Sequence, residues 1–145
     1  GLSWITVLRK RENYRRALAG FDPEAVARFP KRKIDSLMRD PGLIRNRAKL
    51  ESAVGNARVF LDVRESYGSF ADYLWEFVDG EPVRNRFRSI DQVPSSTPLS
   101  DALSKDFKKR GFKFVGTTIC YSYMQAVGLV NDHITRCFRY RDKRG

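Results

Sequence analysis

The sequence predicts an all-α fold, with several helices in a single domain. Apolar residues recur at helical spacing in most segments from Ile5 to Tyr140. Residues typical of helix ends separate these segments. Asp22-Pro23 is typical of a helix N-terminus, whereas Gly20, Pro30 and Gly42 interrupt helices. The 145 residues suffice for one domain with a hydrophobic core, and the chain shows no internal repeat.

The first 40 residues predict three helices. Residues 5–19 form an amphipathic basic helix, with apolar residues on one side and arginines largely on the other. Its apolar residues are Val7, Leu8, Tyr14 and Leu18. Asp22 then caps a short helix that ends near Phe29, and residues 31–39 carry Ile34, Leu37 and Met38 at helical spacing.

The middle of the chain predicts a long helix, an aromatic helix and a covering loop. Residues 43–65 are the longest helical segment, and we expect a close helix crossing at Gly55 to explain a glycine there. Ser69 caps residues 70–78, whose stripe of aromatic residues we interpret as core. Residues 79–96 form an irregular loop anchored by apolar side chains, namely Val83, Phe87, Ile90 and Val93.

Two further helices are joined by a very short turn, so that residues 100–128 form a hairpin. The first helix begins near Thr97-Pro98 or Ser100. Its apolar side carries Ala102, Leu103 and Phe107, and that of the second carries Ile119, Cys120, Tyr123, Met124 and Val127.

The turn between these helices has two glycines. Gly111 has the place of a helix C′ residue and Gly116 precedes the second helix, so the turn exposes backbone N–H groups that can hold a phosphate. Positive charge surrounds this turn, supplied by Lys108, Lys109, Arg110 and Lys113. From the pattern alone, an ordinary helical hairpin with solvated lysines is an equal alternative.

Composition favours a polyanionic partner. The chain has 28 Lys and Arg against 17 Asp and Glu, a formal charge of +11, with arginine spread along most of its length. It has no apolar run that could span a membrane and no signal-peptide pattern, so we expect a soluble, cytoplasmic protein. Two cysteines do not make a disulfide framework. The chain starts without Met or an obvious cap, as though it begins inside a fold.

Signatures of enzymes and metal sites are scarce. The sequence has no Walker loop, dinucleotide fingerprint, nucleophile elbow or Cys-x-x-Cys pair. His133 and Cys137 are four residues apart, which on a helix places two zinc-ligand types on one face. Two ligands do not complete a tetrahedral site, and a core histidine near a buried cysteine is the more common arrangement. Asn131 or Asp132 would cap a last short helix.

Four segments together resemble the family of DNA-3-methyladenine glycosylase I, within the helix-hairpin-helix glycosylase superfamily. They are GLSWITVL at residues 1–8, SDALSK at 100–105, KKRGFKFVGTTICY at 108–121 and GLVNDH at 128–133. The resemblance covers essentially the whole chain. It implies a helix-hairpin-helix glycosylase fold and a monofunctional enzyme that hydrolyses the N-glycosidic bond of 3-methyladenine in double-stranded alkylated DNA. We also expect a monomer.

The resemblance also implies roles for individual residues. Trp4 matches the tryptophan that stacks on the extruded base, although without the family a core tryptophan would be the simpler interpretation. Gly1 and Leu2 match the loop that meets DNA at the lesion. The turn that clamps the DNA backbone is matched by Arg110, Gly111, Phe112, Lys113, Gly116 and Thr117. His133 and Cys137 match two ligands of a structural zinc.

Several family features have no counterpart in these residues. In the family, a segment upstream of Gly1 supplies the other zinc ligands, a pocket tyrosine and the glutamate that binds the damaged base. We therefore expect a truncated chain with half of each site and no catalytic residue among residues 1–145. Related glycosylases place a catalytic aspartate after the hairpin, but for Asp132 we favour an N-cap. No lysine is placed as a Schiff-base nucleophile, so lyase activity is not expected.

Two other classes of protein stay open on the sequence alone. One is a non-catalytic helix-hairpin-helix DNA-binding module, and the other is a basic RNA-binding protein, for which the chain has no stacking-sheet or Gly-x-x-Gly signature. Release of free base from methylated DNA would separate the enzyme from both.

Overall fold

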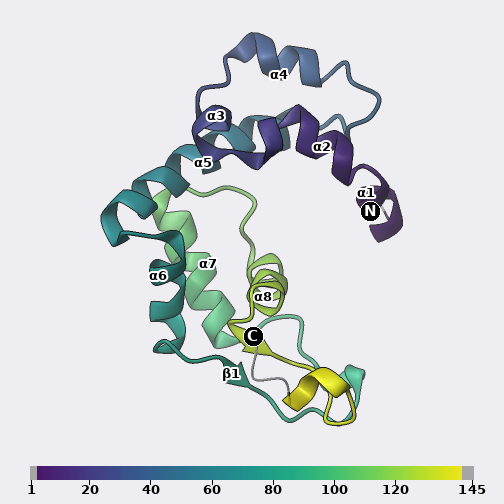
Figure 1. The fold of residues 1–145 in the computed structure, drawn as a ribbon, viewed down its shortest axis with the longest axis vertical. Coiled ribbons are helices and arrows are strands. Elements are labelled where there is room, and N and C mark those ends of the chain that lie inside the picture. Colours follow the sequence, from purple (N-terminus) through teal and green to yellow (C-terminus); the bar gives the residue numbers. More distant parts are fainter. Residues whose placement is uncertain (1–2, 142–145) are drawn as a thin grey trace. The chain divides into compact units, whose positions relative to one another are not determined.

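The structure is a computed structural model that describes residues 3–141, and it is mainly helical (Figure 1). The α-helices are α1 Trp4–Arg9, α2 Arg11–Ala17, α3 Pro23–Ala27, α4 Lys31–Leu37, α5 Arg47–Tyr67, α6 Phe70–Trp75, α7 Pro98–Arg110 and α8 Thr117–Ala126. Short 3-10 turns are η1 Ala19–Phe21, η2 Glu76–Val78, η3 Ile90–Gln92 and η4 Phe138–Arg141. Two short strands, β1 Val83–Arg84 and β2 Val130–Asn131, pair in parallel. The prediction of an all-α fold is confirmed, apart from this two-stranded sheet.

The chain forms two compact units, which are described separately. Unit 1 comprises Gly1–Asp62 with Gly111–Phe114, and unit 2 comprises Val63–Arg110 with Val115–Gly145. Helix α5 contributes its first residues to unit 1 and its last residues to unit 2. The hairpin turn is likewise divided, because Gly111–Phe114 pack with unit 1 whereas Val115 and Gly116 belong to unit 2.

Unit 1 has its own hydrophobic core, formed by apolar residues of α2 to α5 and the turn before α5. The buried residues are Ala17, Val26, Ala27, Ile34, Leu37, Leu43, Leu50, Val54 and Ala57. Asp22 caps α3 as predicted, since its carboxylate accepts from Glu24 N at 2.9 Å and Pro23 is the first helical residue.

The N-terminal prediction of one helix over residues 5–19 is wrong. The chain leaves helical geometry at Lys10 (φ −93°, ψ 0°), so α1 and α2 are separate helices. Val7 and Leu8 are exposed, and only Tyr14 and Leu18 of the predicted apolar side pack against the core. The spacing of apolar residues continues across Lys10 and therefore does not reveal the break.

The start of the long helix and the role of its glycine were also predicted wrongly. Helix α5 begins at Arg47, because the Asn46 side chain accepts from Lys49 N at 3.1 Å and so caps it. Leu43 is buried in the preceding turn. Apart from its chain neighbours and the nearby backbone of α5, a Cβ built on Gly55 would meet no atom of the described residues within 4 Å, so a close helix crossing does not explain Gly55.

Unit 2 is organised around buried residues of α6, α7 and α8. Ser69 caps α6 as predicted, and Tyr73 is 1% exposed and contacts Phe107 with ring centroids 6.1 Å apart. The aromatic stripe is therefore core, as predicted. Thr97 and Ser100 bond reciprocally through side chain and backbone at the start of α7, which fixes Pro98 as its first residue.

Several details of unit 2 differ from the sequence prediction. On α8 the buried residues are Cys120, Tyr121 and Met124, whereas Ile119 and Val127 are exposed. Ala102 of α7 is also exposed. In the loop over residues 79–96, Val83 and Ile90 are exposed and do not anchor it, because the backbone of β1 is held by its pairing with β2 instead. The short helix predicted after Asn131 or Asp132 does not form over residues 132–137, and only the 3-10 turn η4 follows them.

Candidate functional site

The turn between α7 and α8 has the backbone geometry that its glycines predicted. Gly111 has φ +104°, which only glycine adopts readily, and it follows the last residue of α7. Gly116 is extended and precedes the first residue of α8. Phe114 has φ +60°, a left-handed conformation that is unfavourable for a residue with a Cβ. This conformation was not predicted, because no glycine marks it.

Within unit 1, the turn is attached to α5 by two hydrogen bonds. Asn56 Nδ2 donates to Lys113 O at 3.0 Å, and Lys113 N donates to Asn56 Oδ1 at 2.8 Å. The amide of Lys113 is therefore engaged, which reduces the number of free N–H groups below our expectation. Gly111, Lys113 and Phe114 are exposed, and Lys49 Nζ lies 5.8 Å from the centroid of the Phe114 ring.

Within unit 2, the start of α8 is held to α7 by two serines. Ser104 Oγ donates to Val115 O at 2.6 Å, and the hydroxyls of Ser100 and Thr117 are 2.8 Å apart. Both serines are buried. Thr117, predicted to contact DNA, therefore has an internal partner for its hydroxyl.

Arg110, also predicted to contact DNA, lies in a network inside unit 2. Its Nε donates to Asp106 Oδ2 at 2.6 Å and one terminal nitrogen donates to Tyr67 Oη at 2.7 Å. Its guanidinium carbon lies 5.1 and 4.7 Å from the ring centroids of Tyr67 and Tyr73. The hydrogen bond that Arg110 donates to Asp106, together with the negative charge of that carboxylate, holds the pKa of Arg110 above its ordinary value, although burial opposes the shift.

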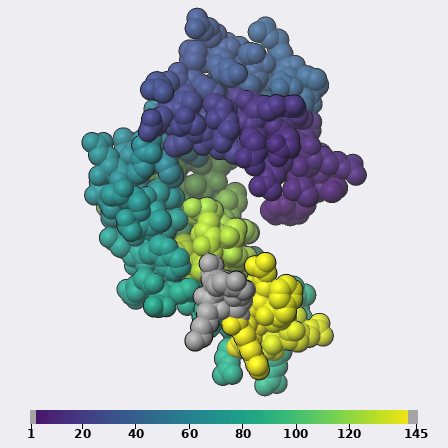
Figure 2. All heavy atoms as spheres, in the orientation of Figure 1, coloured from purple at the N-terminus to yellow at the C-terminus, as the bar shows by residue number. Residues whose placement is uncertain are grey.

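Trp4 lies at the start of α1, which Ser3 caps by accepting from Thr6 N at 3.4 Å. Its side chain is 86% exposed, so the interpretation as a core tryptophan is wrong for the described residues. Figure 2 shows this N-terminal part of unit 1, in dark purple, at the edge of that unit. Gly1 and Leu2, predicted to meet DNA at the lesion, lie outside the described residues.

His133 and Cys137 lie close together, although no helix carries them. Cys137 Sγ is 3.6 Å from His133 Nδ1. In a tetrahedral zinc site with ordinary Zn–S and Zn–N bonds, these two atoms would be about 3.6 Å apart. The pair therefore fits two ligands of such a site. Among residues 3–141, no group of three or more His, Cys, Asp or Glu side chains is placed to hold a metal.

Asp132 does not cap a helix, so that prediction is wrong. Its carboxylate accepts a hydrogen bond from Tyr121 Oη, and others from Gln125 Nε2 at 2.8 Å and from Asn85 Nδ2 at 2.7 Å. These donors come from α8 and from the residue that follows β1. Burial, and then the hydrogen bond to Asp132, raise the pKa of Tyr121 above its ordinary value. The sequence could not indicate this cluster, because its members belong to different elements and Asn85 is 47 positions from Asp132.

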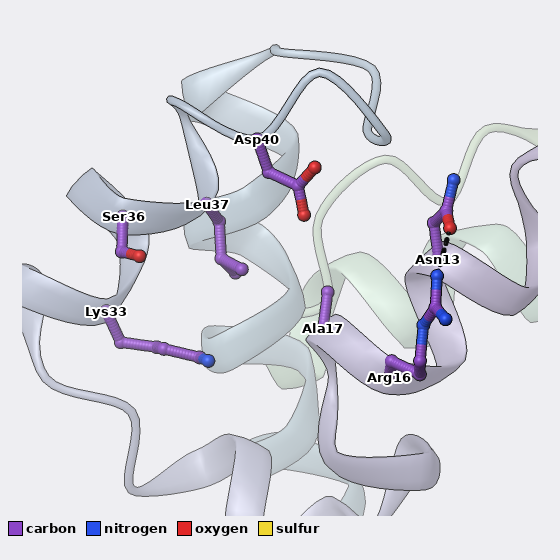
Figure 3. A pocket seen from close by; sticks show the side chains of 7 residues that line it. All are labelled: Asn13, Arg16, Ala17, Lys33, Ser36, Leu37 and Asp40. Atoms are coloured by element: carbon purple, nitrogen blue, oxygen red, sulfur yellow. Dashed lines mark hydrogen bonds between the residues drawn. The ribbon is translucent and has the colours of Figure 1, made fainter.

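Unit 1 also has a polar cavity of about 280 Å³ between α2 and α4 (Figure 3). Arg16 and Asn13 line one side, with Arg16 donating to Asn13 Oδ1 at 2.6 Å. Lys33 and Asp40 line the other, and Asp40 accepts from Gly42 N at 2.7 Å. None of the residues predicted to form a site lies here.

Comparison with known proteins identifies the chain. The family model for methyladenine glycosylase matches residues 1–140. The chain belongs to the methyladenine glycosylase family. It is a DNA repair glycosylase, an enzyme that hydrolyses N-glycosyl bonds. The resemblance found in the sequence is thereby confirmed.

Relatives of this glycosylase match nearly all of its length. It is 51% identical over 140 residues to DNA-3-methyladenine glycosylase 1 of Escherichia coli, covering 97% of this chain and 75% of the relative. It is 49% identical over 137 residues to DNA-3-methyladenine glycosylase of Haemophilus influenzae, covering 94% of this chain and 74% of that relative. The solved 3-methyladenine DNA glycosylase I of Staphylococcus aureus is 36% identical and matches with a TM-score of 0.92, over 100% of this chain and 77% of that one. No helix within residues 3–141 of the glycosylase is long and apolar enough to cross a membrane.

Proposed function

We propose that this glycosylase releases 3-methyladenine from double-stranded alkylated DNA, by flipping the damaged nucleotide out of the duplex and without cleaving the strand. The names of its relatives in Escherichia coli and Haemophilus influenzae support the substrate. Flipping is required because the glycosidic bond of a stacked base is not accessible within the duplex.

The exposure of Trp4 is the observation that supports its proposed role in binding the extruded base. A tryptophan that is 86% exposed does not contribute to a core, and its free ring face can stack on a planar ligand. A methylated adenine is cationic and electron-poor, so an electron-rich indole suits it better than an ordinary base. Trp4 therefore favours the extruded, alkylated base over a base in the stack.

The chemical step needs little acid catalysis. N3-methylation makes the base a cation, and when the bond from C1′ to N9 breaks, its electron pair neutralises that charge. Water forms the new bond to C1′ and its proton passes to solvent. Selectivity then comes from extrusion, stacking on Trp4 and recognition of the base edge. A monofunctional reaction needs no amine nucleophile, and no lysine is proposed for that role.

DNA binding is proposed to use the turn that contains Gly111, Phe112 and Lys113, followed by Gly116 and Thr117. More than half of the 28 Lys and Arg residues, but fewer than half of the 17 Asp and Glu, lie in unit 1, which includes the exposed Lys113. Positive charge of this kind binds phosphates irrespective of sequence. Of the residues predicted to contact DNA, Arg110 has the least support, because its guanidinium already donates to Asp106 and Tyr67.

His133 and Cys137 are proposed as two ligands of a structural zinc ion. Bound zinc would cross-link the segments that carry its ligands and stabilise the fold. His133 would bind through Nδ1 and Cys137 as a thiolate, and neither would take part in bond cleavage.

The test is release of free base by the full-length gene product that contains these 145 residues. Duplex DNA methylated in vitro is incubated with the protein, and released bases and strand breaks are measured separately. We expect 3-methyladenine to be released with strands left intact. Binding to the duplex without release would instead indicate a non-catalytic DNA-binding protein.

A further inference from the structure

We infer that Asn56 is a positioning residue for DNA binding, which holds the turn at Lys113 in the conformation that contacts the phosphate backbone. The inference rests on the proposed function of that turn. It adds a residue of α5 that is 57 positions away in sequence and that no pattern in the chain points to.

The geometry of the contact is specific to an amide side chain. Asn56 uses its donor for the carbonyl of Lys113 and its acceptor for the N–H of the same residue, at 3.0 and 2.8 Å. Two bonds to one residue fix the peptide groups on both of its sides, as a neighbouring strand would. Aliphatic residues lack both groups, and aspartate lacks the donor.

The conformation of the turn explains why such support is needed. Phe114, the next residue, has φ +60°, and Gly111 has φ +104°, so the chain changes direction twice within four residues. A left-handed phenylalanine is unfavourable by itself and persists only where surrounding contacts determine it. The bonds to Lys113 and the contact of Phe114 with Lys49 provide those contacts.

Helix α5 can provide both the hydrogen bonds to Lys113 and the contact with Phe114 because of its periodicity. Lys49 and Asn56 are seven residues apart, close to two helical turns, and therefore share a face. Asn56 is half-buried while Lys113 is exposed. The backbone of Lys113 is thus held against the helix, and its cationic side chain is left for the partner.

The experiment compares Asn56→Ala with Asn13→Ala in the full-length gene product. Asn13 is a matched control in unit 1, because its amide also donates to a backbone carbonyl, that of Gly42 at 3.1 Å, but at the polar cavity (Figure 3). Three quantities are measured: the Kd for undamaged duplex, the single-turnover rate of 3-methyladenine release at saturating DNA, and hydrogen exchange of the Lys113 amide.

For Asn56→Ala we expect a Kd about tenfold higher, from the loss of two hydrogen bonds that order the turn. The rate at saturating DNA should be unchanged, and exchange of the Lys113 amide should be faster. Asn13→Ala should change none of these three, even if it lowers the melting temperature. If Asn56→Ala does not fold, Asn56→Asp replaces it, since aspartate keeps the acceptor and loses the donor.

An unchanged Kd for Asn56→Ala, or an equal increase for Asn13→Ala, would overturn the inference. A wild-type protein that binds duplex but releases no 3-methyladenine would refute the proposed function, while the two Kd values would still decide the role of Asn56. A wild-type protein that does not bind duplex would overturn both.

Discussion

Tyr73 and Asp106 form a hydrogen bond of 2.6 Å inside unit 2, from the Tyr73 hydroxyl to Oδ2 of the carboxylate. The same oxygen accepts from Arg110 Nε at 2.6 Å. Burial acts to raise the pKa of Asp106, but the hydrogen bonds from Tyr73 and Arg110 together outweigh it, so the pKa lies below its ordinary value. For Tyr73, burial and then the bond to Asp106 raise the pKa.

This pair predicts a loss of stability in acid. When Asp106 has a lower pKa in the folded state, the unfolded chain binds its proton first as the pH falls. The stabilisation is therefore complete above the ordinary carboxyl pKa and is lost as the pH falls through the folded value. Asp106→Asn should reduce the free energy of unfolding at neutral pH by about 1 to 3 kcal/mol. Urea unfolding from about pH 5 to about pH 2 should then show a weaker pH dependence for the variant. An equally steep loss in both proteins would contradict this assignment.

Lys113→Glu should weaken binding to every duplex alike. Lys113 is exposed in the turn and its charge is proposed to meet phosphates, which carry no sequence information. The slope of log affinity against log salt should also decrease by about 1. Lys105→Glu, an equal charge change at an exposed site within α7, is the control and should have a smaller effect. A loss confined to one DNA sequence would exclude the backbone role.

Features of the fold could be predicted where they depend on residues only a few positions apart in the sequence. The caps at Asp22 and Ser69 were found because a capping side chain bonds an amide two or three residues away. Gly111 was placed correctly because a positive φ after a helix is a glycine conformation. Apolar spacing located α4, α6 and α7, because each buries one face.

Features that depend on distant residues could not be predicted. The break at Lys10 leaves the apolar spacing intact, and the pairing of β1 with β2 joins segments of two residues that carry no strand pattern of their own. The partners of Asn56 and Asp132 are selected by the fold. Helical spacing also placed His133 and Cys137 on a helix, and although that helix does not form, the two side chains still meet.

Asp132→Asn should affect stability rather than chemistry. Its carboxylate is the shared acceptor of Tyr121, Gln125 and Asn85. Asparagine is neutral and has an NH2 group in place of one oxygen, so all three donors lose their anionic partner and at least one of them loses its acceptor. We expect a loss of about 1 to 3 kcal/mol in the free energy of unfolding. The rate of base release should be unchanged at a temperature where the variant is folded. A rate lower by more than about a hundredfold, with an unchanged melting temperature, would place Asp132 in the chemical step.

His133→Ala should remove bound zinc from the full-length gene product. The two ligand atoms are spaced as in a tetrahedral site, and loss of either leaves an incomplete ligand set. Elemental analysis of the purified protein is the measurement, with a lower melting temperature as the second readout. Asp132→Asn is the control, since this neighbour is not a proposed ligand and should retain the metal. Full zinc content in His133→Ala would refute the assignment.

Trp4→Ala should separate base recognition from DNA binding. Because the ring is exposed, its removal should leave the melting temperature and the affinity for undamaged duplex nearly unchanged. Loss of one base stacked on an aromatic ring, about 1 to 3 kcal/mol, predicts a roughly tenfold to hundredfold slower release of 3-methyladenine. A core tryptophan would behave differently, since its truncation costs about 3 to 5 kcal/mol of stability and would reduce binding and release together. All three quantities are measured on the full-length gene product. Parallel loss of all three would refute stacking, and an unchanged release rate would remove Trp4 from the mechanism.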